Sequence, residues 1–193
     1  PFPFDPAEVD WLILTHGHLD HLGLVPRLVR EGFQGKGICT VPTRDIAQVM
    51  LMDAARIQEE ENGALYTVED ALDALDRLTH LVEYGDKVEL GRGVRVKFHD
   101  AGHILGAAFV EVQAEGKTLI FSGDLGNRGK SLVEDPSYPP KADIVVLEST
   151  YGDRHHPPVE ESVEELRRVI VETLEGGGNV VIPSFALERT QEV

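Results

Sequence analysis

Hydrophobic and polar positions along the chain follow two patterns, one typical of strands and one typical of helices, which alternate along the sequence. Short apolar or alternating runs predict β-strands near residues 10–15, 36–41, 88–90, 94–99, 107–113, 117–122, 143–148 and 179–184. Longer segments with helical spacing predict helices over residues 20–31, 43–61, 67–78 and 160–175. Glu115-Gly116 marks a turn between two strands, and Gly176-Gly177-Gly178 ends the last long helix by allowing a left-handed cap. This alternation predicts an α+β fold with a mixed sheet covered by helices.

The run from Leu14 to Gly23 carries four residues that can bind a metal ion. They lie at positions i, i+2, i+4 and i+5 and are His16, His18, Asp20 and His21. A strand that ends at Thr15 and continues into a tight loop would direct three imidazoles and a carboxylate at one point. So much desolvated polar surface needs compensation, which a divalent cation supplies. The alternative, a polar loop with incidental histidines, is disfavoured by the density of the cluster.

Two further candidate ligands follow later strands. His103 lies in Asp100-Ala101-Gly102-His103, and Asp124 lies in Ser122-Gly123-Asp124-Leu125-Gly126. Each comes just after a predicted strand and near glycine, which lets the backbone turn sharply. Six ligands exceed the need of one tetrahedral zinc ion and suit two ions about 3.5–4 Å apart. A closed structural zinc site is a poor match because the chain has a single cysteine, Cys39.

The pattern His16-x-His18-x-Asp20-His21, followed by His103 and Asp124, resembles the metallo-β-lactamase superfamily over nearly the whole chain. Two later motifs narrow the resemblance: Glu148-Ser149-Thr150-Tyr151-Gly152, and the run from Pro183 to Glu192. Both are similar to the β-CASP branch, the nucleic-acid-processing nucleases that include the cleavage and polyadenylation endonuclease. The resemblance implies an αβ/βα sandwich of mixed sheets covered by helices, incomplete at both ends.

The resemblance also implies a domain division. Residues 1–183 would form a partial metallo-β-lactamase domain without its N-terminal hairpin region, and residues 184–193 would begin the β-CASP domain. The other β-CASP motifs and the last metal-binding histidine would lie beyond Val193. We therefore expect an internal segment of a longer protein, nearly inactive by itself.

The ligand roles follow from the same resemblance. One Zn²⁺ would be held by His16, His18 and His103. A second Zn²⁺ would be held by Asp20, His21 and a histidine outside the chain, and Asp124 would bridge the two ions. Mn²⁺ is an alternative, because imidazole and carboxylate ligands accept either metal.

The implied activity is hydrolysis of RNA phosphodiester bonds by a hydroxide that two metal ions activate. The candidate catalytic residues are Asp20, itself a ligand, and Glu148, which would orient a β-CASP histidine that protonates the leaving oxygen. Glutamate at the position of Glu148 is typical of the relatives that act on RNA. The substrate would be single-stranded RNA, cut internally or also from the 5′ end. Two alternatives stay open: a hydrolase of small esters, thioesters or lactams, and a metal-free scaffold subunit.

Composition limits these interpretations. The net charge of −16 is unexpected for a nucleic-acid binder and argues against a broad electrostatic RNA surface on this segment. Two dications would offset four of these charges locally. A single cysteine excludes an internal disulfide framework and fits a cytoplasmic location. No apolar run is long enough to span a bilayer, so no membrane partner is expected. The oligomeric state is open, with a homodimer among the alternatives.

Overall fold

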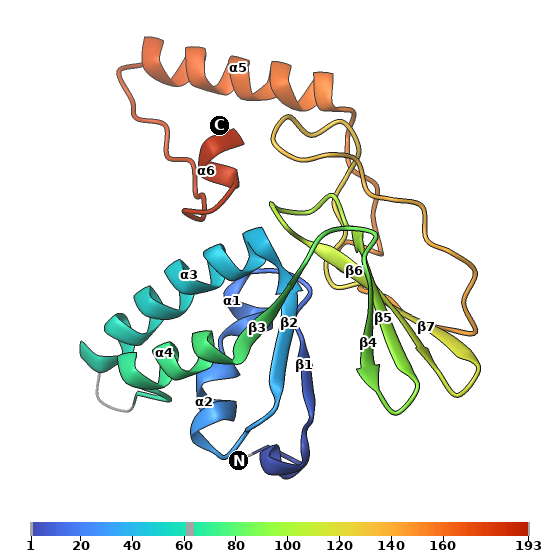
Figure 1. Ribbon diagram of the computed structural model, residues 1–193. Helices are drawn as coiled ribbons and strands as arrows, with labels where there is room; N and C mark the ends of the chain where they lie inside the picture. Colours follow the sequence, from blue (N-terminus) through green and yellow to red (C-terminus); the bar gives the residue numbers. More distant parts are fainter. Residues whose placement is uncertain (1, 61–63, 193) are drawn as a thin grey trace. The chain divides into compact units, whose positions relative to one another are not determined.

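A computed structural model describes residues 2–60 and 64–192 of the chain (Figure 1). The chain divides into two compact units, residues 1–148 and residues 149–193.

The first unit contains two sheets. The first sheet is parallel, with the order β1-β2-β3, and its strands are β1 (Trp11–Ile13), β2 (Lys36–Thr40) and β3 (Leu78–Val82). The second sheet has the order β4-β5-β6-β7-β8 and is antiparallel except for the parallel pair β7–β8. Its strands are β4 (Lys87–Gly91), β5 (Val94–Asp100), β6 (Ala108–Ala114), β7 (Lys117–Phe121) and β8 (Ile144–Val146).

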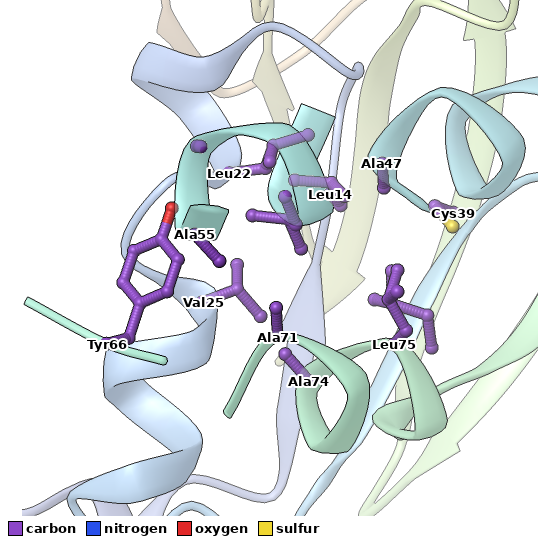
Figure 2. Close-up of a cluster of buried hydrophobic side chains, with 13 residues drawn as sticks. Leu14, Leu22, Val25, Cys39, Ala47, Ala55, Tyr66, Ala71, Ala74 and Leu75 are labelled. Atoms are coloured by element: carbon purple, nitrogen blue, oxygen red, sulfur yellow. The ribbon is translucent and has the colours of Figure 1, made fainter. Parts of the chain in front are cut away.

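Helices cover one face of the first sheet. They are α1 (Leu19–Leu22), α2 (Val25–Arg30), α3 (Val41–Glu60) and α4 (Val68–Arg77), and the short 3-10 helix η1 (Pro6–Glu8) precedes β1. Figure 1 shows α1–α4 on one side of β1–β3 and the second sheet on the other side. The helix-covered core includes Leu14, Cys39 and Leu75, and Figure 2 shows these side chains converging between the helices and the sheet.

Alternation along the strands builds a second core between the two sheets. In β2, Ile38 packs against the second sheet, whereas its neighbour Cys39 faces the helices. Phe98 of β5 and Val110 of β6 meet Ile38 from the other side, and all three side chains are fully or almost fully buried. The period of two therefore divides β2 between two apolar layers, as expected of a layered sandwich.

The second unit holds α5 (Val159–Glu175) and α6 (Arg189–Glu192). Helix α5 ends as the glycine run predicts. Gly177 has φ +73°, the Gly177 amide donates to the carbonyl of Leu174, and the Gly178 amide donates to the carbonyl of Thr173. This pair of bonds is a Schellman cap, which satisfies carbonyls that the helix end leaves open.

Three parts of the predicted layout are wrong. The predicted helix 20–31 is two helices, because Pro26 has no amide to donate to Leu22 and its ring crowds that carbonyl. The predicted strand 179–184 is not a strand, since none of the described residues of the second unit forms a sheet with it. Strand β3 was not predicted, because no glycine or proline separates it from α4. The predicted helix 43–61 corresponds to α3, and its last position, 61, lies outside the described residues.

None of the helices in the described ranges combines the length and apolar character that crossing a bilayer requires.

The inter-sheet core gives a stability prediction. Replacing the fully buried Phe98 by alanine removes the aromatic side chain and leaves a cavity, so unfolding should become easier by about 3–5 kcal/mol. The matched control, Val49→Ala on the exposed face of α3, should change stability by no more than about 0.5 kcal/mol. Chemical denaturation of the two variants beside the parent measures both values. Equal effects would contradict the assignment of this core.

Candidate metal centre

The six predicted ligands come together at one end of the two sheets. Leu14 and Thr15 continue from β1 into the loop that carries His16 and His18, and α1 carries Asp20 and His21. The remaining two lie in the loops after β5 and β7. Two groups can each hold one ion: His16, His18, His103 and Asp124 in the first, and Asp20, His21 and Asp124 in the second. Within each group the ligand atoms lie within 4.8 Å of one another.

Asp124 is common to both groups and presents a different oxygen to each. Its Oδ2 lies 3.7 Å from Nε2 of His16 and 3.6 Å from Nε2 of His103. Its Oδ1 lies 3.2 Å from Nε2 of His21, which is itself 3.5 Å from Oδ2 of Asp20. A carboxylate placed in this way can bridge two cations.

Burial keeps the imidazole of His16 neutral, so one of its ring nitrogens retains a lone pair that can bind a metal ion. The residue is fully buried, and its Nε2 has no hydrogen-bond partner among the described residues. Burial, reinforced by His21 and the other nearby histidines, lowers the pKa of His16 from 6.5 to about 2. Its Nδ1 lies 3.2 Å from the hydroxyl of Thr15. With Nδ1 donating to that oxygen, the lone pair of Nε2 faces Asp124.

The pKa of His103 is lowered as well. Burial first, and then the neighbouring His18, lower the pKa of His103 below its usual range. Its Nε2 lies 3.1 Å from Nδ1 of His18, so two imidazole nitrogens point at each other with no carboxylate between them. The unpartnered buried nitrogen of His16 and the two closely placed nitrogens of His18 and His103 fit a cation. Nitrogen and oxygen donors without thiolate match Zn²⁺ or Mn²⁺.

Glycines allow the ligand loops to approach closely. A Cβ atom at Gly126 would lie 1.5 Å from the carbonyl oxygen of Gly102, and the Gly126 amide donates to the carbonyl of Ala101 at 2.9 Å. A Cβ atom at Gly123 would lie 2.8 Å from Cβ of Thr15. The loop of Asp124 therefore packs directly against the loop of His103 and the end of β1. Any larger residue at Gly126 would force these loops apart.

Two polar neighbours of His103 lie outside both groups. His99 places its Nε2 3.0 Å from Oε2 of Glu111 and stacks on Phe109, with ring centroids 4.7 Å apart. Asp100 accepts a hydrogen bond from the amide of Gly102 at 2.8 Å, which shapes the loop that carries His103.

Glu148, the second predicted catalytic residue, lies just after β8 and belongs to neither ligand group. Its Oε1 accepts a hydrogen bond from the amide of Leu125, the residue after Asp124, at 2.9 Å. Sequence reasoning also missed two supporting contacts. Ser122 accepts from the amide of Glu148, and Lys130 donates from Nζ to the carbonyl of His103 at 2.7 Å. Both residues follow strand β7 in a glycine-rich stretch, but spacing alone does not indicate their partners.

Residues 3–184 match the family model of the metallo-beta-lactamase superfamily. The chain belongs to the metallo-beta-lactamase superfamily. This membership confirms the predicted fold class and implies that the cluster binds divalent metal.

The chain is also similar to curated proteins that are named as ribonucleases or as transcription termination factors. The chain is 48% identical to Ribonuclease TTHA0252 of Thermus thermophilus over 100% of its length, and covers 44% of that protein. It is 35% identical to the transcription termination factor FttA of Methanocaldococcus jannaschii over 98% of its length, and covers 31% of that protein. It is 31% identical to Endoribonuclease YSH1 of Kluyveromyces lactis over 98% of its length, and covers 26% of that protein. The predicted resemblance to the β-CASP branch is thus confirmed, and the chain spans less than half the length of these relatives.

The buried histidine gives a pH prediction. In protein stripped of metal with a chelator, the unfolded chain takes up a proton on His16 below pH 6.5, whereas the folded chain does not until about pH 2. Stability should therefore fall as the pH decreases from 6.5, with His16 contributing up to about 1.4 kcal/mol per pH unit. Urea denaturation at a series of pH values measures this slope.

A variant pair isolates the contribution of His16. His16→Gln should show a shallower loss of stability on acidification, while His155→Gln, at an exposed loop position, should keep the slope of the parent. An unchanged slope in His16→Gln would contradict the assignment of a buried, neutral imidazole.

Proposed function

We propose that the protein containing this chain is a zinc-dependent ribonuclease that uses two metal ions. One observation carries this proposal: the two carboxylate oxygens of Asp124 face different ligands. Its Oδ2 faces His16 and His103, while its Oδ1 faces His21. Such a carboxylate serves two cations better than one. The names of the relatives support RNA as the substrate, because two of them are a ribonuclease and an endoribonuclease.

The proposed ligands divide by burial. The first ion would be held by His16, His18, His103 and Asp124, and the second by Asp20, His21 and Asp124 with a further ligand from outside the chain. The side chain of Asp20 is 76% exposed and that of His21 30% exposed, whereas His16 is enclosed. Substrate would therefore arrive from the side of the second group, which is more open to solvent.

The two ions, when bound, would lower the pKa of a water molecule and stabilise charge on the phosphoryl oxygens. The chain itself holds the ligands, orients them through the contacts of Thr15 and Lys130, and excludes water from His16. The proton donor for the leaving oxygen is proposed to be a histidine outside residues 1–193.

The proposal extends to the organisation of the protein. Residues 1–183 would be part of the metallo-beta-lactamase domain, and residues 184–193, which include α6, would begin the β-CASP domain. Single-stranded RNA would be cut internally, with 5′ exonuclease activity as an additional mode. With a net charge of −16 on this segment, most phosphate contacts would come from other parts of the protein. We also propose a cytoplasmic location.

Cleavage by the full-length protein tests the function. End-labelled single-stranded RNA and DNA of the same sequence are incubated with the parent and with Asp20→Asn. The parent should cut RNA only. The variant should lose on the order of a hundredfold or more in rate, because the amide binds a divalent cation weakly. A matched control, Asp153→Asn, changes an exposed aspartate of the second unit and should cleave like the parent.

Cleavage of small esters or lactams without cleavage of RNA would contradict the proposal and favour a small-molecule hydrolase. Equal rates for Asp20→Asn and the parent would remove Asp20 from the active site.

A further inference from the structure

The loop that carries Asp124 is held by hydrogen bonds on both sides of this residue. On its C-terminal side, the amide of Leu125 donates to Oε1 of Glu148 at 2.9 Å. On its N-terminal side, the hydroxyl of Ser122 donates to the carbonyl of Gly123 at 2.7 Å. The peptide groups next to Asp124 are thus each tied to a side chain.

The two side chains are also tied to each other. The amide of Glu148 donates to Oγ of Ser122 at 2.9 Å, and the amide of Ser122 donates to the carbonyl of Val146 at 2.9 Å. Ser122 is 4% exposed, so its side of these bonds is shielded from solvent. The end of β8 and the end of β7 are therefore locked in a fixed register at the point where Asp124 begins its loop.

We propose that Glu148 and Ser122 are positioning residues that orient Asp124 toward both metal ions. The carboxylate of Glu148 acts as an acceptor for the Leu125 amide, and the hydroxyl of Ser122 joins that carboxylate's own backbone to Gly123. This inference rests on the proposed function for its two metal ions. It assigns to Glu148 a role inside the chain, distinct from the predicted contact with a histidine elsewhere.

Glu148 and Ser122 together form a clamp on the loop of Asp124, and the geometry explains why this clamp matters. Asp124 must present Oδ1 to His21 and Oδ2 to His16 and His103 at the same time. A rotation of the loop would keep one contact and lose the other. Groups that orient metal ligands through hydrogen bonds typically contribute 10–100-fold to metal affinity. The clamp predicts that the acceptor oxygen of Glu148 matters more for affinity than its negative charge does.

Substitutions at Glu148 separate these two properties. In the full-length protein, Zn²⁺ affinity is measured by competition with a chromophoric chelator for the parent, Glu148→Ala and Glu148→Gln. Alanine removes the acceptor, and affinity should fall about 10–100-fold. Glutamine keeps an oxygen of the same reach, and affinity should stay within about threefold of the parent. Circular dichroism of each variant checks that the fold is intact.

Ser122→Ala supplies an independent test, because it removes both side-chain bonds without touching charge. Its Zn²⁺ affinity should fall in the same direction as that of Glu148→Ala. The matched controls are Ser131→Ala and Glu165→Ala, at exposed positions, and both should bind Zn²⁺ like the parent.

Three outcomes would overturn the clamp: parent-like affinity in a folded Glu148→Ala, parent-like affinity in Ser122→Ala, or a loss in Glu148→Gln as large as in the alanine variant. If Glu148→Ala does not fold, Glu148→Gln and Ser122→Ala still decide the question. RNA cleavage by the parent is recorded in parallel. Absence of cleavage with the expected affinities would reject the proposed function and leave the clamp in place.

Discussion

The structure depends on one electrostatic constraint. Imidazole lone pairs and carboxylate charges converge at a place that solvent reaches only in part. His16 is enclosed with an unpartnered Nε2, and the nitrogens of His18 and His103 face each other at 3.1 Å. Burial of such groups is unfavourable unless a positive charge or a donor compensates it. A bound cation is the simplest compensation, and metal binding and folding should be coupled here.

The sandwich makes this convergence possible. Its strands supply rigid ends, and the loops that leave β1, β5 and β7 place their ligands at the same edge. Gly126 and Gly123 let the loop of Asp124 contact the two other loops directly. The two apolar layers, one under the helices and one between the sheets, hold those strand ends in place. Stability of the core and geometry of the centre are thus properties of the same strands.

Much of this arrangement could be predicted because it is local in sequence. Asp20 and His21 follow His16 and His18 within six residues, and each later candidate follows a predicted strand. The errors have a different origin. Residues 179–184 have the composition of a strand, but a strand also needs a neighbour to pair with. Strand β3 follows α4 without a breaker, so its pairing with β2 shows only in three dimensions.

Contacts between distant residues were equally inaccessible from sequence. Lys130 supports the loop of His103, and Ser122 contacts Glu148, across 27 and 26 residues respectively. Glu148 could be singled out from its motif, but the motif does not show that its carboxylate binds the Leu125 amide. Hydrogen bonds of this kind depend on which strand ends become neighbours. That choice follows from the packing of the whole sandwich rather than from any single segment.

In the proposed centre, Asp124 bridges two cations. The most direct test is the metal content of the full-length protein, purified without chelator and measured by inductively coupled plasma mass spectrometry, beside Asp124→Ala. We expect about two divalent ions per chain in the parent, since the centre offers two sets of ligands, and a clear loss of metal in the variant. Less than one ion per chain in the parent, or an unchanged content in the variant, would contradict it.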